Sequence, residues 1–176
     1  WNETKLHSDF YRFAVRAMIA VNGERSLIGA IIPPSILHTN GVESFAFKNI
    51  EHLLAFSAFC TSLVGDFLVK ASGMDNIHAS VIARFPFVNP SVLVSERILR
   101  LHCLTPEYEL LFEEFQSKHL SYLRSVSHPL FEEKFGFTFS SRTEYERRRN
   151  LVEIDVLVAQ TYGLTLANLI ELYKVY

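Results

Sequence analysis

The sequence has few of the residues that mark several protein classes. Only two cysteines occur among its 176 residues, Cys60 and Cys103, and neither has a close partner in the chain. This excludes a disulfide-rich secreted scaffold and a zinc site made of four cysteines. Seventeen basic and nineteen acidic side chains leave a formal charge of −2, so the strong positive charge of a simple nucleic-acid-binding domain is absent.

Long apolar runs are also missing. The longest, Leu53 to Gly65, is interrupted by serine and threonine and ends at Asp66. It is shorter than the roughly 20 residues of a membrane span, so we expect no membrane partner. The chain starts at Trp1 and shows no signal-peptide pattern. We therefore expect a piece of a longer cytoplasmic protein, with a processed terminus as the alternative.

Catalytic motifs are the third absence. No Gly-x-Ser-x-Gly, Gly-x-Gly-x-x-Gly, Walker loop or His-Glu-x-x-His occurs, and the seven histidines lack the i, i+4 pairing of a helical metal site. An amino-methyltransferase loop needs Asn or Asp before two prolines and an aromatic residue. Ile32 precedes Pro33-Pro34, and Asn89-Pro90 lacks the second proline. We expect no catalytic, cofactor-binding or metal-binding residue in this chain itself.

The residues that are present predict a folded core with a small sheet. Apolar residues make up 49 % and charged residues 20 % of the chain, which disfavours disorder. Two β-prone runs, 10–21 and 26–32, flank Asn22-Gly23 and predict a hairpin with a connection longer than two residues. Pro33-Pro34 ends its second strand. Residues 77–87 predict a further short, irregular strand.

Helices are predicted for the rest of the chain. The apolar stretch 51–71 predicts one helix that is buried on more than one side and ends at Ser72-Gly73. Further helices are expected over 91–101, from Thr105-Pro106-Glu107 onward, over 143–162 and over 165–173, with 125–142 as a connection. The predicted fold class is α+β, with a small mixed or antiparallel sheet and flanking helices in residues 1–104 and a helical C-terminal part in residues 105–176.

Charge differs between these two parts. Residues 1–104 hold nine Lys/Arg and eight Asp/Glu, whereas residues 105–176 hold eight and eleven. The first part is therefore the better place for phosphate binding. The basic run Arg147-Arg148-Arg149 lies among Glu144, Glu146 and Glu153, which favours an ion-paired, solvated helix face over a DNA patch.

Three stretches carry a resemblance to one enzyme family. Residues 16–34 read RAMIAVNGERSLIGAIIPP, residues 70–86 read KASGMDNIHASVIARFP, and residues 151–173 read LVEIDVLVAQTYGLTLANLIELY. In this order they resemble the region that follows the catalytic domain in large adenine-specific DNA methyltransferases. These enzymes belong to bacterial restriction–modification and phage-defence systems and include fused type IIG enzymes. Relative to the family pattern, Gly23 is inserted and Ser26 replaces a threonine.

The resemblance implies a target-recognition domain for double-stranded DNA, without catalysis of its own. Its partners would be duplex DNA and the catalytic methyltransferase domain of the parent chain. That domain would bind S-adenosylmethionine and receive the target adenine after it leaves the base stack. The alternative is a protein-docking or structural module of the same kind of enzyme, in which the helix over 51–71 and the C-terminal helices dock without touching DNA. The charge of −2 favours this alternative.

Candidate DNA-binding side chains gather in two segments of the first part. The hairpin offers guanidinium groups and an amide, which pair with guanine and adenine edges, although for Glu24 and Arg25 we favour structural pairs that hold the turn. The loop after residue 70 offers hydrogen-bond donors around Gly73, with an ordinary surface loop as the alternative. The candidate DNA-binding residues are Arg12, Arg16, Asn22, Arg25, Lys70, Ser72, Asn76, His78 and Arg84.

Overall fold

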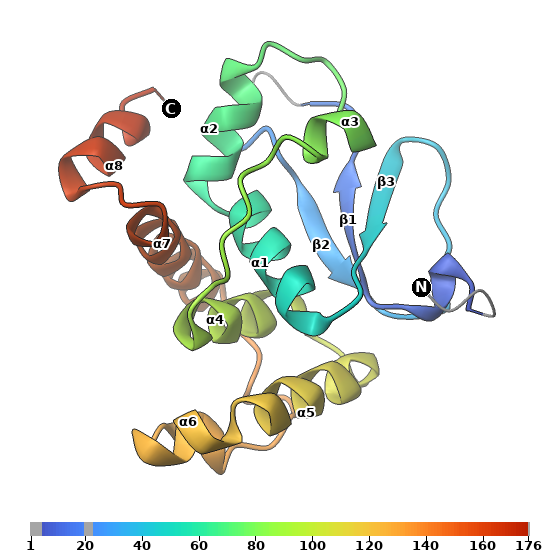
Figure 1. The fold of residues 1–176 in the computed structure, drawn as a ribbon, viewed down its shortest axis with the longest axis vertical. Coiled ribbons are helices and arrows are strands. Elements are labelled where there is room, and N and C mark those ends of the chain that lie inside the picture. The colour runs from blue at the N-terminus through green and yellow to red at the C-terminus, as the bar shows by residue number, and fades with distance from the viewer. Residues whose placement is uncertain (1–4, 20–22, 176) are drawn as a thin grey trace.

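Residues 5–19 and 23–175 are described by the computed structural model, which has an α+β fold with a helical C-terminal part (Figure 1). The predicted fold class is therefore confirmed. Within these residues the strands are β1 (Arg12–Arg16), β2 (Gly29–Ile32) and β3 (Val42–Ala46). The α-helices are α1 (Ile50–Thr61), α2 (Leu63–Ala71), α3 (Ala79–Ile82), α4 (Val92–His102), α5 (Glu109–Lys118), α6 (Leu120–Ser125), α7 (Glu144–Thr161) and α8 (Leu166–Tyr173). Short 3-10 turns lie at His7–Asp9, Pro106–Tyr108 and Pro129–Phe131.

The strands form an antiparallel sheet in the order β2-β1-β3. The predicted hairpin is confirmed, because β1 pairs with β2 from Arg12↔Ile32 to Val15↔Gly29 and β2 ends before Pro33. Both strands are shorter than expected, and the connection between them is correspondingly long. β3 is not predicted from the sequence, because its glutamate, serine and alanine give a weak strand pattern.

The two faces of the sheet differ. Phe13 and Val15 are each 1 % exposed on the face that α1 covers, and the Phe13 ring meets the Phe56 ring edge-on, with centroids 5.5 Å apart. Side chains alternate along a strand, so the neighbouring positions point to the opposite face. The strand register places Arg12, Ala14, Arg16, Ile28, Ala30, Ile32, Val42, Ser44 and Ala46 on that outer face. None of these side chains is acidic.

The apolar stretch 51–71 folds as two helices rather than the predicted one. The chain bends by 67° between α1 and α2, and the Ser62 hydroxyl accepts a hydrogen bond from the Gly65 N–H. A Cβ at Gly65 would lie 2.1 Å from the Phe59 carbonyl oxygen, so only glycine fits this close approach. Within the described residues, no single helix has the length and apolarity to cross a membrane, and α1 with α2 meets that criterion only as this bent pair.

The strand predicted over residues 77–87 is wrong. This segment contains α3 and turns, and the isolated β-bridge between Met18 and Asn76 lies one residue before it. Ser80 and Ala83 are exposed and Val81 is buried, so the segment covers the core as one helical turn instead of pairing in the sheet.

The helices of the second half follow their local signals. Ser91 caps α4, and Thr143 and Thr165 cap α7 and α8 through reciprocal bonds with Glu146 and Asn168. Thr105 makes no such side-chain bond, and the segment after it starts as a 3-10 turn before α5. One buried apolar cluster runs from Phe13 to Val158, so the parts 1–104 and 105–176 share a core.

Candidate nucleic-acid interface

Two segments far apart in the sequence meet at the end of β1. The Ile19 N–H donates to the Asp75 carbonyl oxygen at 3.0 Å, and the Ile77 N–H donates to the Ala17 carbonyl oxygen at 2.7 Å. These bonds lie on either side of the Met18–Asn76 bridge. Together they form an isolated β-bridge just beyond β1, which joins the chain after β1 to the loop between α2 and α3. The end of β1 and the loop between α2 and α3 therefore lie together, near α3 in Figure 1.

Exposed polar side chains gather at this end. Arg16, Asn76, His78 and Arg84 are exposed, and we call these residues the β1-end patch. Within residues 5–19 and 23–175, neither guanidinium of the patch makes an ion pair, which leaves both free for a ligand. Asp75, which immediately precedes Asn76 in the chain, is an exposed acidic residue of the same loop. The patch therefore combines two cations, an amide and an imidazole, and the carboxylate of Asp75 is next to its Asn76 in the chain.

A pocket of about 380 Å³ adjoins the patch and is lined by Ser72, Met74, Arg84 and Phe85, among others. The Ser72 hydroxyl donates to the Val69 carbonyl oxygen at 2.6 Å and so closes the end of α2. Lys70 is half-buried in the last turn of the same helix. The structure therefore joins the backbone that follows Arg16 to the loop after α2, and it places Ser72 and Arg84 on one pocket that Arg16, Asn76 and His78 do not line.

Arg12 and Arg25 lie elsewhere and are held by the protein itself. Arg12 is 3 % exposed, and it donates to the Ser44 hydroxyl and the Ile36 carbonyl. Burial lowers the pKa of Arg12. Arg25 donates to the Asp155 carboxylate at 2.7 Å. Neither guanidinium is presented to the solvent beside the β1-end patch, and Asn22 lies outside the described residues.

Two buried carboxylates hold the hairpin connection against the helices. Asp66 accepts the N–H groups of Ser26 and Leu27 at 2.7 and 2.6 Å. Asp155 is fully buried, and it accepts Arg25, the Leu63 N–H at 2.5 Å and the Tyr173 hydroxyl at 2.6 Å. Burial and the Asp155 carboxylate raise the pKa of Tyr173, so its hydroxyl stays protonated as a donor.

These two residues are not predicted from the sequence. Asp155 lies within the resemblance, but its spacing in α7 indicates only a helical position. Its bonds tie the segments 16–34 and 151–173 together at the start of α2. The pairing favoured for Glu24 and Arg25 is therefore present, with α7 as the partner element: Arg25 with Asp155 and Glu24 with Arg148.

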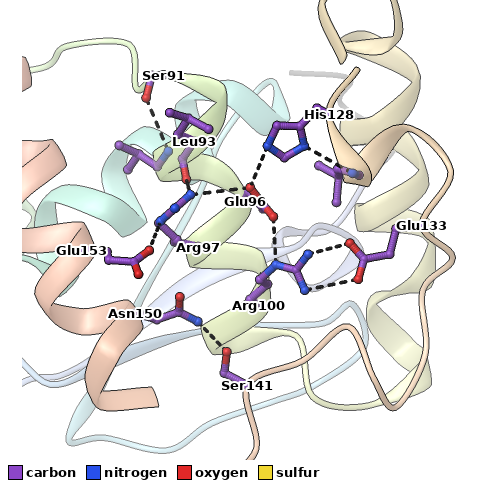
Figure 2. A network of polar contacts seen from close by, with 12 residues as sticks. Ser91, Leu93, Glu96, Arg97, Arg100, His128, Glu133, Ser141, Asn150 and Glu153 are labelled. Atoms are coloured by element: carbon purple, nitrogen blue, oxygen red, sulfur yellow. Dashed lines mark hydrogen bonds and ion pairs between the residues drawn. The ribbon is translucent and has the colours of Figure 1, made fainter. Parts of the chain in front are cut away.

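A second polar cluster surrounds α4, and we call it the α4 network (Figure 2). Glu96 is buried and pairs with Arg100 at 2.9 Å, while Arg100 also pairs with Glu133 at 2.5 Å. The other members are Arg97, His128 and Glu153. The His128 Nδ1 accepts the Leu130 N–H, so its Nε2 is the atom that faces Glu96. Each charged side chain of this network contacts another member, so the network holds the helices together and presents no free charge to a ligand.

Two of the three arginines in the basic run of α7 also have acidic partners. Arg147 donates to the carbonyls of Leu101 and Ser141, Arg148 pairs with Glu24 at 2.5 Å, and Arg149 lies 3.6 Å from Glu153. The ion-paired helix face favoured by the sequence analysis is therefore present for Arg148 and Arg149, whereas Arg147 bonds to backbone carbonyls instead.

Nucleophiles and metal ligands are not assembled. Cys60 and Cys103 are buried, and burial raises the pKa of each thiol, so neither is a reactive thiolate. Burial, with Arg147 nearby, lowers the pKa of His102 to about 4. Within the described ranges, no group of His, Cys, Asp and Glu side chains has the arrangement of a metal site.

Comparisons with protein-family models, curated proteins and solved structures find no match to this chain.

Proposed function

We propose that this chain recognises double-stranded DNA as part of a cytoplasmic adenine-N6 methyltransferase or fused restriction–modification enzyme. In this proposal the catalysis and the S-adenosylmethionine site belong to another domain of the parent chain. The observation that carries the proposal is the meeting of the resembling segments. Residues 16–34 and 70–86 bond to each other through Ala17 and Ile77, and residues 151–173 bond to the first of them through Asp155.

The β1-end patch is the proposed contact surface. Arg16 and Arg84 would neutralise phosphates, because both are exposed and neither is paired among the described residues. Asn76 would read a base edge, since its amide matches the N6 and N7 atoms of adenine, and the neighbouring carboxylate of Asp75 suits the N4 amino group of cytosine. The outer face of the sheet, which has no acidic side chain, would lie toward the DNA backbone.

The test is binding of the chain to a labelled duplex of mixed sequence, measured by fluorescence anisotropy at several salt concentrations. Two to three phosphate contacts predict an affinity that falls by about 10- to 40-fold between 50 and 200 mM salt. Arg16→Gln and Arg84→Gln should each reduce the slope of log K against log salt by about one. Arg148→Gln is the matched control, because Arg148 is an exposed arginine outside the patch.

Docking without DNA contact is the second candidate, and the exposed face of α8 favours it. Leu166, Ile170 and Tyr173 are 70 %, 46 % and 41 % exposed at the i, i+4 and i+7 spacing of one helix face. α1 cannot dock in this way, because this chain's own core buries it. A failure to bind the duplex at 50 mM salt, by a chain that is folded, would favour this second candidate over DNA recognition.

A further inference from the structure

A groove of about 390 Å³ runs along the free edge of β2, on the side of the strand that faces α4 and α7. Residues 27–32 form one wall. Leu101, Leu104 and Leu151 belong to the helical side and make it apolar. The β1-end patch contributes no residue to this groove, so a ligand here would be separate from DNA bound at the patch.

The strand edge in this groove has unused hydrogen-bonding groups. The Arg16 N–H donates to the Ile28 carbonyl. In an antiparallel pair the hydrogen-bonded positions alternate, so the backbone N–H and carbonyl groups of residues 28, 30 and 32 point toward β1. Gly29 and Ile31 therefore direct their backbone groups to the groove. The Ile31 carbonyl accepts the Tyr108 hydroxyl at 2.7 Å. The N–H and carbonyl of Gly29 and the N–H of Ile31 have no partner among the described residues.

The groove also carries positive charge without a carboxylate in its lining. Arg147 lines it and donates only to backbone carbonyls, so its charge is not neutralised by an acidic partner among the described residues. Arg25 pairs with Asp155 through Nη2, whereas its Nη1 is buried and has no partner. Burial and Arg147 lower the pKa of the adjacent His102 to about 4, which keeps that imidazole neutral near pH 7.

We propose that this groove binds an extended acidic peptide segment, which adds to β2 as a fourth strand and sets a carboxylate against Arg147. Backbone bonds to Gly29 and Ile31 would supply the affinity, and the arginine and the leucine wall would select the side chains. β2 spans only about 13 Å, so about four peptide residues would be in contact. A peptide fits these observations better than DNA, because a strand edge pairs with a peptide backbone and not with a phosphate chain.

The first test varies the ligand and leaves the protein intact. The probe is a fluorescein-labelled peptide of alternating valine and glutamate, titrated with the full chain and followed by anisotropy. We expect saturable binding, at least tenfold weaker when lysine replaces glutamate. N-methylation of every second peptide nitrogen should abolish binding in one phase of the alternation and spare it in the other, because only one edge of the added strand faces β2.

The second test varies the protein. Arg147→Gln should weaken peptide binding by about tenfold or more, because a charge-assisted hydrogen bond is lost. Arg148→Gln, at the next position of α7 and outside the groove lining, should leave binding unchanged. The proposal is overturned if the peptide does not bind, if the lysine peptide binds equally, or if both N-methylated peptides bind alike. A competition experiment with duplex DNA gives a further check. Displacement of the peptide from the wild-type chain but not from Arg147→Gln would also overturn the proposal.

Discussion

The α4 network and the β1-end patch use the same kinds of side chain in opposite ways. In the network, Arg100 lies between Glu96 and Glu133, donates to the Phe139 carbonyl at 2.7 Å and stacks over the Phe139 ring. Its pKa is lowered by burial, but the hydrogen bonds to Glu133 and Glu96 outweigh this and raise it. In the patch, Arg16 and Arg84 are exposed and have no acidic partner within the described residues.

This difference in pairing and exposure indicates which arginines are available to a ligand. A charged group that is already paired and partly buried must lose those contacts before it meets anything else, and the loss costs several kcal/mol. An exposed, unpaired guanidinium loses only hydration. The number of arginines in a segment is therefore a poor guide to nucleic-acid binding in this protein, and their existing partners decide the matter. The following changes test this contrast.

The largest effect is expected at Asp155. Asp155→Ala removes the acceptor of Arg25, the Leu63 N–H and the Tyr173 hydroxyl, and leaves a guanidinium without its partner. We expect the free energy of unfolding to fall by about 3–5 kcal/mol in urea denaturation followed by circular dichroism. The free energy of unfolding of Asp155→Asn, which keeps one carbonyl oxygen as an acceptor, should lie between those of the wild-type chain and Asp155→Ala.

The control for Asp155 is Glu171→Ala, which breaks an exposed pair with Lys174 and should cost less than about 1 kcal/mol. Equal effects of Asp155→Ala and Glu171→Ala would show that the buried carboxylate does not hold the hairpin, α2 and α8 together.

The next largest effect is expected at Arg100. Arg100→Ala leaves Glu96 and Glu133 without their shared cation, and Glu96 is buried. Because the Arg100 side chain is still about one-fifth exposed, we expect a loss somewhat below that for a fully buried pair, about 2–3 kcal/mol. Glu96→Gln in the same urea experiment should lower stability less, because it keeps a hydrogen-bond acceptor. An unchanged midpoint for Arg100→Ala would contradict the structural role of the network.

A pH titration gives a loss of stability of about 2 kcal/mol at about pH 5 through His102. Its pKa is about 4 in the folded chain and near 6.5 when exposed, so between these values the unfolded chain binds a proton that the folded chain does not. Stability is then highest above pH 6.5 and falls as the pH drops toward 4. His102→Gln should remove this part of the acid destabilisation, which is read from the difference between the two pH profiles. Parallel profiles would show that His102 is not buried as a neutral group.

Local signals account for most of what the sequence predicts correctly. The hairpin, the end of β2 before Pro33 and the capped helices α4, α7 and α8 depend on neighbouring residues, whose types restrict the backbone directly. The break between α1 and α2 at Ser62 is not predictable from local signals. Residues 51–71 are apolar almost throughout, and the bend depends on Gly65 meeting the Phe59 carbonyl and on Asp155, which lies far along the chain.

The candidate site shows the same limit. Arg12 and Arg16 occupy the same outer face of β1, and the strand pattern alone makes them equivalent. The Ile36 carbonyl and Ser44 engage Arg12, while Arg16 stays exposed. The meeting of Ala17 with Ile77 likewise depends on tertiary packing and is not encoded in the spacing of either segment. The sequence thus indicates which residue types could bind DNA, and the long-range contacts decide which of these side chains remain available to a ligand.

The smallest effect on stability is expected at Arg16, one of the two arginines proposed to contact DNA. Arg16→Ala removes a side chain with no partner among the described residues, so the free energy of unfolding should change by only about 0.5 kcal/mol or less in the urea experiment that shows the loss at Arg100. The same substitution therefore separates the two regions directly. A loss at Arg16 as large as that at Arg100 would mean that Arg16 is also a structural residue, and its exposure would then be no argument for a ligand. A small loss would mean that the fold does not depend on Arg16, which is the condition that DNA recognition at the β1-end patch requires.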